Sequence, residues 1–293
     1  MRVKKQLGVA SDREVREAKK KFIFGYEGAE TEVQYFKGIS NHREELGINK
    51  LIEIINLERR DISKSNQLDV VKEIDSFLKR IKEYNDEEVD LRDRIKNIFC
   101  TYDIKINEEI EEFLNNEINI KDKDEYINKV SELLENEEKK NFLETIESIK
   151  TLENIEFGYD EINIILDRDF KSFTEEQFKE VIDICKKNNY NLGLTNPCFE
   201  FWLLLHHTDC IEEFDIEEIK LNPKISSRRN YLGKCLVKKL GSYKKDKIRF
   251  EKDFKDNIPI AIKNAEKYCR DVEKLKDNVG SSVGDILIKM TCD

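Results

Sequence analysis

Histidine is scarce in this chain, and its cysteines form no pairs of the kind that bind zinc. The 293 residues include three histidines, at positions 42, 206 and 207, and no H-E-x-x-H motif. The seven cysteines form an odd set without a C-x-x-C pair. These absences argue against a zinc hydrolase built on imidazole ligands, a zinc ribbon and a disulfide framework. We expect the cysteines to be reduced thiols.

Long apolar runs and a phosphate-binding loop are also missing. No stretch reaches the roughly 18 uninterrupted apolar residues that a membrane-spanning helix needs, and the first residues lead into no apolar signal core. The glycines at 280 and 284 are not part of a G-x-x-x-x-G-K-[ST] motif, because the lysine that would reach phosphate is absent. We therefore expect a cytoplasmic protein with no membrane partner, in which any control by ATP acts through another protein.

Charge is distributed unevenly along the chain. Its composition is typical of a soluble, globular protein, with a net charge of −10 and a mean hydropathy of −0.67. Residues 85–157 contain 22 acidic and 10 basic residues, whereas residues 220–255 contain 13 basic and 3 acidic residues. A basic surface with interspersed aromatic residues is typical of contact with a phosphate backbone, although a solvated helix face can have the same composition. The candidates for nucleic-acid binding are Arg228, Arg229, Lys234, Lys238, Lys239, Lys244, Lys245, Lys247 and Arg249.

Apolar runs and amphipathic patterns alternate on both sides of the acidic segment. Runs at 22–26, 51–57, 161–166 and 190–194 predict strands buried in a parallel sheet. Apolar spacings of three and four predict helices at 65–84, 174–188, 259–276 and 284–290. Residues 85–157 lack glycine and proline and show the same helical spacing. We expect residues 1–84 and 158–293 to form an α/β domain, a mainly parallel sheet flanked by helices, with 85–157 as an inserted all-helical subdomain.

Acidic residues follow directly after two of the predicted strands. Glu27 and Glu32 follow the first strand, and Asp167 and Asp169 come at the end of a later one. Ligands of such sheets bind outside the carboxyl ends of the strands, and carboxylates suit hard cations such as Mg2+ or Mn2+. Both aspartates can turn toward one cation from an extended loop, and Glu27 would reach it from the first strand. The pattern predicts hydrolysis of phosphodiesters.

The stretch that begins at Asn196 is the most distinctive of the chain. Asn196 and Pro197 predict the cap and the first residue of a very apolar helix. Glu200 falls in the first turn of this helix, where it can ligate a cation or can simply be a partner of the helix dipole. Arg168, between the two aspartates, is expected to face the other side of the sheet.

Together these motifs resemble the Toprim fold and, more closely, the RloB family. The resemblance lies in E-G-x-x-T-E-x-x-Y-F from residue 27, L-D-R-D from residue 166 and N-P-C-F-E-F-W-L-L-L-H from residue 196. It covers roughly residues 20–84 and 158–290 and leaves the acidic helical segment as an insertion. The resemblance implies catalytic or metal-binding roles for Glu27, Asp167 and Asp169, and further roles for Glu32, Glu200 and His206.

The resemblance also implies an activity and a partner. Proteins of this kind are nucleases in bacterial anti-phage systems, where an ABC- or AAA-type ATPase encoded nearby controls them. We therefore expect Mg2+- or Mn2+-dependent cleavage of DNA or RNA, tRNA included, by a chain that can form homo-oligomers. Two alternatives stay open. One is a haloacid-dehalogenase-like phosphatase, and the other is a catalytically silent scaffold whose acidic segment docks on an ATPase. The acidic segment could instead mimic nucleic acid or act as an autoinhibitory flap over the basic surface.

Overall fold

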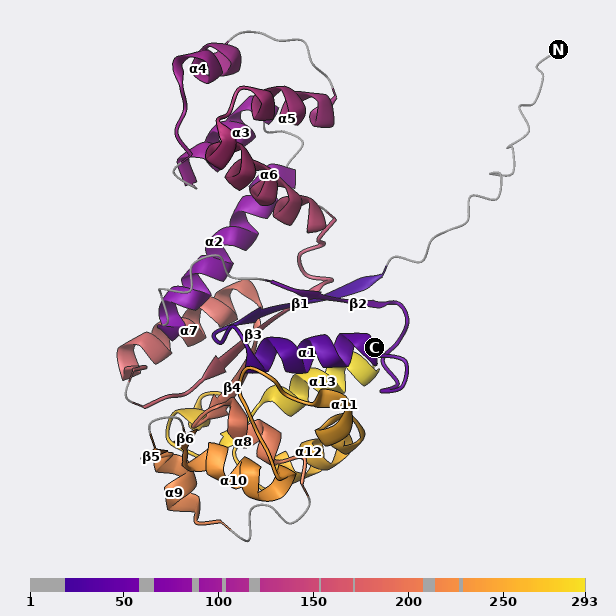
Figure 1. Cartoon of the computed structure of the whole chain (residues 1–293), viewed down its shortest axis with the longest axis vertical. Coiled ribbons are helices and arrows are strands. Elements are labelled where there is room, and N and C mark those ends of the chain that lie inside the picture. The colour runs from indigo at the N-terminus through magenta and orange to yellow at the C-terminus, as the bar shows by residue number, and fades with distance from the viewer. Residues whose placement is uncertain are drawn as a thin grey trace, which may run out of the picture. The chain divides into compact units, whose positions relative to one another are not determined.

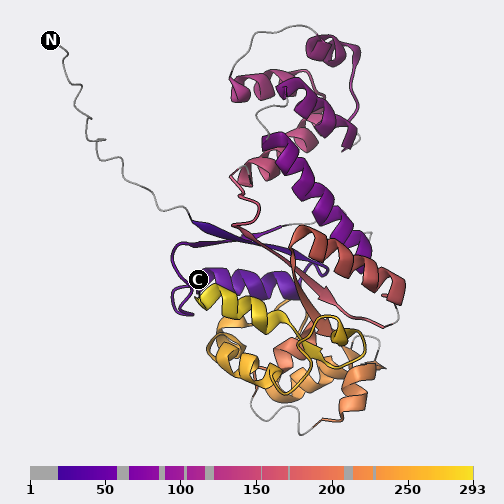
Figure 2. The same ribbon diagram turned by 180° about the vertical axis from the view of Figure 1, so that it is seen from behind.

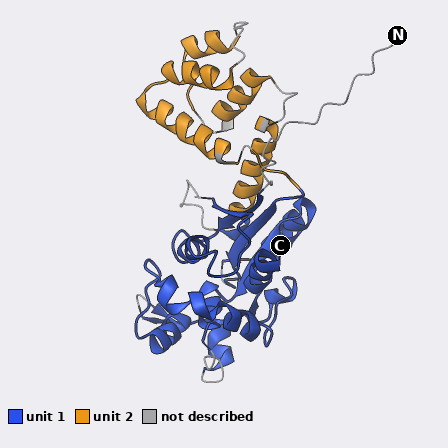
Figure 3. Cartoon of the chain, turned by 90° about the vertical axis from the view of Figure 1, so that its right-hand side faces the viewer, with its two compact units in different colours: residues 1–68, 158–293 blue, residues 69–157 orange. Residues whose placement is uncertain are grey.

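Two compact units make up the chain (Figure 3). Unit 1 comprises residues 1–68 and 158–293, and unit 2 comprises residues 69–157. The acidic segment defined from composition begins at residue 85, so unit 2 also contains most of helix α2 (Gln67–Asn85). The computed structural model describes residues 19–57, 66–85, 90–101, 104–115, 122–152, 154–170, 172–207, 214–226 and 229–292.

Within its described residues, unit 1 is built on a five-stranded, mostly parallel sheet (Figure 1). The strand order is β2-β1-β3-β4-β7; the first four strands are parallel, and β7 runs antiparallel to β4. The strands are β1 (Lys20–Tyr26), β2 (Ile52–Asn56), β3 (Glu161–Asp167), β4 (Asn191–Asn196) and β7 (Gly280–Ser281). The predicted α/β fold with a mainly parallel sheet flanked by helices is confirmed.

Both faces of this sheet are covered, which explains why its strands read as nearly continuous apolar runs. Alternate residues of β1, at positions 22, 24 and 26, join a large core with α1 (Thr31–Asn41), α8 (Phe199–Leu204) and α13 (Val283–Cys292). Helix α7 (Glu175–Asn188) lies along the opposite face from α1 and α13 in both views (Figures 1 and 2). Its capping box of Thr174 and Gln177 has the predicted spacing.

The C-terminal part of unit 1 adds a small hairpin and further helices to the core. These elements are α9 (Ile216–Leu221), β5 (Lys224–Ser226), β6 (Arg229–Asn230), α10 (Tyr231–Leu240), α11 (Phe250–Asp253) and α12 (Ile258–Ala265). The prediction that one helix spans 259–276 was wrong. Helix α12 ends early because Cys269 pairs with Gly280 at the edge of the sheet, which takes the chain out of helical geometry.

Unit 2 is helical within its described residues. Besides α2, it contains α3 (Leu91–Thr101), α4 (Glu108–Asn115), α5 (Lys123–Glu132) and α6 (Asn136–Thr151). Phe99 and Phe142 stack with ring centroids 5.3 Å apart and join α3 to α6. Asp122 caps α5 through the backbone N–H of Glu125. Over the part of the chain that the structure describes, no helix is long and apolar enough to cross a bilayer.

Candidate metal centre

Three adjacent strands bring their carboxyl ends to one edge of the sheet. β3 lies between β1 and β4, and all three run parallel, with Tyr26 opposite Ile165 and Asp167 opposite Thr195. The residues that follow these strands must therefore meet, however far apart they are in the sequence. They are Glu27 after β1, Asp167 at the end of β3, and Cys198 and Glu200 after β4.

Glu27 is fixed against the end of β3. Its backbone N–H donates to the carbonyl of Ile165 at 3.0 Å. Its carboxylate accepts two further hydrogen bonds, one at Oε2 from the backbone N–H of Asp167 and one at Oε1 from Nε2 of Gln67, each 2.9 Å long. The structure thus brings Glu27 to Asp167, across 140 residues of sequence.

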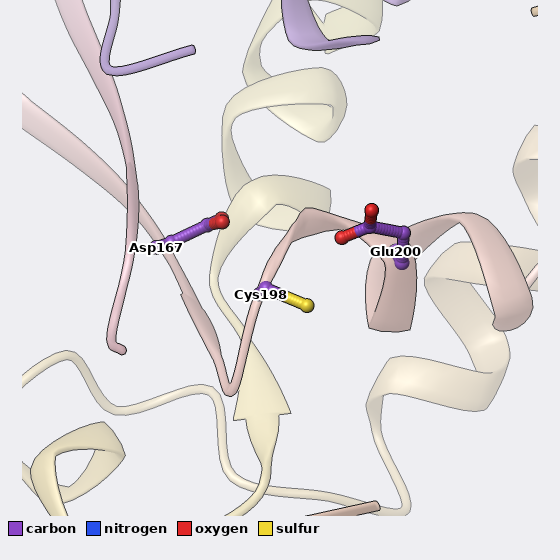
Figure 4. A group of neighbouring side chains, drawn as sticks. All are labelled: Asp167, Cys198 and Glu200. Atoms are coloured by element: carbon purple, nitrogen blue, oxygen red, sulfur yellow. The ribbon is translucent and has the colours of Figure 1, made fainter. Parts of the chain in front are cut away.

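Among the residues that the structure describes, Asp167, Cys198 and Glu200 form a close group of potential ligands (Figure 4). One ligand atom from each residue lies within 4.8 Å of those of the other two. Figure 4 shows the Asp167 carboxylate pointing toward Glu200, with the sulfur of Cys198 between them in this view. Sequence reasoning missed Cys198, which it counted as one of the reduced thiols. The available signal was its position two residues before Glu200, shortly after the predicted strand 190–194.

The start of α8 depends on Asp167 rather than on a cap of its own. The sequence predicted Asn196 as the cap and Pro197 as the first helical residue, and this was wrong: β4 runs through Asn196, and Cys198 is the N-cap residue. The Asn196 amide instead donates to the carbonyl of Leu275 at 2.7 Å. Oδ1 of Asp167 accepts the backbone N–H of Phe199 at 2.7 Å, so the neighbouring strand supplies the acceptor that a cap normally provides.

Glu32 reaches the same region from the first turn of α1 and lies over Gly28. A Cβ atom at residue 28 would lie only 2.3 Å from Oε2 of Glu32, so glycine makes room for this carboxylate. The Glu32 side chain is 8% exposed, and this burial, together with the charges of Glu200 and Glu30, raises its pKa to about 7.

Lys245 supplies a positive charge to this otherwise acidic group. Its ammonium lies 2.5 Å from Oε1 of the buried Glu200, while its side chain stays 58% exposed. Burial lowers the pKa of Lys245, but Glu200 more than offsets this and holds the pKa above its usual range. The backbone around Lys245 is tied to α1, because Thr31 Oγ1 donates to the Lys245 carbonyl at 3.0 Å and Gln34 Oε1 accepts the N–H of Ile248 at 3.0 Å.

Negative charge accumulates at this edge of the sheet. Burial raises the pKa of Asp167 well above its usual value, and three neighbouring carboxylates raise it further. These carboxylates belong to Glu27, Glu32 and Glu200. Burial likewise raises the pKa of the Cys198 thiol, with Glu200 adding to the effect. A bound cation would relieve this mutual repulsion, so the group fits a divalent metal ion.

Asp169 lies outside the group of three ligands and flanks it. Its Oδ2 accepts the hydroxyl of Ser172 at 3.0 Å, and its backbone N–H donates to the carbonyl of Pro197 at 3.2 Å, one residue before Cys198. The chain turns directly after Asp169, whose own carbonyl accepts the backbone N–H of Phe173 at 3.0 Å. The two aspartates, expected to share one cation, therefore have different partners.

Arg168 contacts backbone and aromatic rings rather than the acidic group. Its guanidinium donates to the carbonyls of Phe173 at 2.7 Å and Lys276 at 3.0 Å. It also lies over the rings of Phe170, Phe173 and Phe178. This buried side chain holds the loop after β3, which is a structural role.

His206 is a buried structural histidine. Its Nε2 accepts the hydroxyl of Tyr35 at 3.0 Å, and its Nδ1–H donates to the carbonyl of Trp202 at 3.1 Å. Burial lowers its pKa from 6.5 to about 3, so it stays neutral at ordinary pH. Its hydrogen bonds join α1 to α8, the helix that carries Glu200.

The predicted basic surface divides into residues with different environments. Arg249 forms a bidentate ion pair with Asp253. The ammonium groups of Lys238 and Lys239 lie near the ring of Phe214. Lys245 pairs with Glu200. Arg228 lies outside the described residues. The other candidates are exposed: Arg229, Lys234, Lys244 and Lys247.

A protein-family model described as RloB-like protein matches residues 107–290 of this chain, well over half of its length. The match includes Asp167, Cys198 and Glu200, but it does not reach Glu27. It also extends over part of the helical segment that the sequence resemblance had left out as an insertion. No curated protein and no solved structure matches the chain significantly.

Proposed function

This chain belongs to the RloB family, and from that premise we propose that it is a divalent-metal-dependent nuclease. One observation carries the proposal: carboxylates from three separate segments converge at the carboxyl ends of adjacent parallel strands. Asp167 and Glu200 have ligand atoms within 4.8 Å of each other, and Glu27 accepts the backbone N–H of Asp167. These carboxylates come from distant parts of the sequence and lie close together despite their mutual repulsion. This arrangement favours a cation site over a purely structural cluster.

Asp167 and Glu200 are the residues that would hold the cation, with Glu27 and Glu32 beside them. Their oxygen atoms are the donors that Mg2+ and Mn2+ prefer. A bound cation would lower the pKa of water and polarise a phosphoryl oxygen, which are the two effects that phosphodiester hydrolysis requires. Asp169, which flanks the group, would make an outer contact.

The protein's own side chains would orient the reacting groups and move the proton. Two hydrogen bonds, from Gln67 and from the backbone of Asp167, fix the orientation of the Glu27 carboxylate, so it is the candidate for accepting a proton from the attacking water. Lys245, exposed and paired with Glu200, is placed to contact a phosphate. The exposed basic residues Arg229, Lys234, Lys244 and Lys247 would bind the backbone of a longer nucleic acid.

We further propose that a partner ATPase controls this nuclease in anti-phage defence. The sequence contains no P-loop motif, so nucleotide-driven control would have to come from another protein. The acidic composition of unit 2 suits docking on a basic partner surface.

Cleavage assays test the proposal directly. Purified protein is incubated with plasmid DNA, single-stranded DNA and bulk tRNA in Mg2+ or Mn2+, with and without an ATPase encoded beside it. We expect at least one substrate to be cut, and EDTA to stop the reaction. Asp167→Asn should abolish cleavage because it removes a charged ligand. Glu53→Gln, which changes an exposed carboxylate on β2, should retain it.

Other outcomes would count against a nuclease. Cleavage that survives Asp167→Asn would remove the metal centre from the mechanism. Cation binding without cleavage of any substrate would favour a scaffold. Turnover of small phosphate esters through a phosphoenzyme would favour the phosphatase.

A further inference from the structure

We propose that Cys198 is a sulfur ligand of the metal centre, and that the centre therefore prefers Mn2+ to Mg2+. The inference rests on the cation site of the proposed function and specifies its donor set. The Cys198 sulfur lies within 4.8 Å of ligand oxygens of both Asp167 and Glu200 (Figure 4). A site built from two carboxylates and one thiol differs from the all-oxygen sites that Mg2+ favours.

The surroundings of Cys198 differ from those of an ordinary buried cysteine. Cys185 lies on the apolar face of α7, and Cys235 lies in the apolar core of unit 1. Cys198 instead has two carboxylates as close neighbours, and its sulfur accepts a hydrogen bond from Nδ2 of Asn222 at 3.2 Å. An amide that donates to the sulfur would orient and stabilise a thiolate, as outer partners of metal ligands commonly do.

A second observation concerns a buried acceptor next to Glu27. The Gln67 side chain is fully buried, and its Nε2 donates to Glu27, which in turn accepts the backbone N–H of Asp167. The carbonyl oxygen of the same amide, Oε1, is buried without a hydrogen-bond partner among the described residues. An unpaired buried oxygen is costly, so the region has more acceptors than its own donors satisfy.

Sulfur coordination has a definite chemical consequence. When the metal–sulfur bond forms, the thiol loses its proton to solvent, so binding at Cys198 releases one proton. Mg2+ takes oxygen ligands in near-ideal octahedral geometry, and a thiolate is a soft ligand that does not suit it. Mn2+ also binds mainly oxygen, but as a transition-metal ion it loses less affinity than Mg2+ when one ligand is sulfur. Co2+ serves as a probe, because a cobalt–thiolate bond produces a charge-transfer absorption band.

Metal titrations of the full chain test the inference. Wild type, Cys198→Ser and Cys235→Ser are titrated with Co2+, followed by absorption, and with Mn2+ and Mg2+, followed by calorimetry. We expect the cobalt–thiolate band in wild type and in Cys235→Ser, and its loss in Cys198→Ser. The ratio of Mn2+ affinity to Mg2+ affinity should fall by about tenfold or more in Cys198→Ser. Loss of even an outer-shell partner of a metal ligand commonly costs about tenfold in metal affinity. Retained Mg2+ binding shows that this variant keeps a folded site.

The result separates this inference from the proposed function. If Cys198→Ser keeps the cobalt–thiolate band or the same Mn2+ preference, the sulfur assignment is wrong while the carboxylate site stands. If wild type binds none of these cations, or if Asp167→Asn leaves their binding unchanged, the metal-dependent function fails and the sulfur assignment fails with it.

Discussion

Glu32 shows at the level of one residue what it costs to bury several acidic side chains close together. Its pKa is raised from 4.5 to about 7 because the folded protein buries the carboxyl beside other acids. The stabilising contribution of the neutral form is therefore complete below about pH 4.5 and is lost as the pH rises through about 7. Gly28 permits this arrangement by leaving room for the carboxylate.

Replacing Glu32 with Gln should remove this pH dependence. Without divalent cations, wild type and Glu32→Gln should have similar free energies of unfolding at about pH 5, and the variant should be more stable at about pH 8, by up to about 3 kcal/mol. Fluorescence of the single tryptophan, the buried Trp202, reports on unit 1 during urea unfolding. Added Mn2+ should reduce the difference in free energy of unfolding between the two proteins at about pH 8, because the cation stabilises the charged Glu32 carboxylate of wild type. Identical pH profiles for the two proteins would contradict this account.

Only the part of the candidate site that lies directly at the ends of strands was predictable from apolar runs in the sequence. Glu27 and Asp167 were predicted to meet because the carboxyl ends of parallel strands share one edge of a sheet. Glu200 was a candidate from its place in the first turn of the predicted helix and from the motif resemblance. Cys198 was missed because a cysteine acquires ligand character only from its spatial neighbours. The separate hydrogen bonding of Asp169 also could not be read from the sequence, because the backbone turn after β3 decides it.

At the scale of elements, the loop after β3 depends on a buried guanidinium. Arg168 bonds two backbone carbonyls in different segments, at Phe173 and Lys276, and stacks on aromatic rings. It therefore connects the loop that precedes α7 to the segment that leads to β7. A lysine ammonium cannot reproduce this planar, forked geometry.

Arg168→Lys should therefore destabilise unit 1 by about 2 kcal/mol or more, because buried carbonyls lose hydrogen bonds to a charged donor. Urea unfolding followed by Trp202 fluorescence measures the loss. Lys179→Ala, on the exposed face of α7, is the control and should change stability by less than about 0.5 kcal/mol. Equal stability of Arg168→Lys and wild type would show that the guanidinium bonds are dispensable.

Most strands and helices were predictable because apolar spacing is a local property of the sequence. The failures arose where tertiary contacts override it. Asp167 on β3 supplies the acceptor at the start of α8, and α12 ends at Ala265, shortly before Cys269 pairs with Gly280. Neither contact leaves a signal in the residues next to it in the sequence.

At the scale of the whole molecule, the proposed metal centre and the acidic helices belong to different units. Glu27, Gln67, Asp167, Cys198 and Glu200 all lie in unit 1, whereas unit 2 contributes none of the residues of the group. The centre should therefore depend on unit 1 alone for its ligands.

Replacing residues 86–157 with a flexible Gly-Ser linker, which keeps helix α2 and Gln67, should leave unit 1 folded and its affinity for Mn2+ unchanged. Circular dichroism and calorimetry check the two expectations. Cleavage assays on the same protein then show what unit 2 does: higher basal cleavage indicates a cover over the basic surface, and lost response to the ATPase indicates a docking arm. Loss of Mn2+ binding by a folded unit 1 would contradict the assignment of the centre to this unit.

The central claim is that distant carboxylates at adjoining strand ends form one cation site. Counting Mn2+ bound to the full chain by electron paramagnetic resonance tests it most directly. The account predicts saturable binding that Asp167→Asn and Glu200→Gln each weaken by at least about tenfold, while Glu53→Gln has no effect. Absence of saturable binding, or binding that both centre variants leave unchanged, would contradict it.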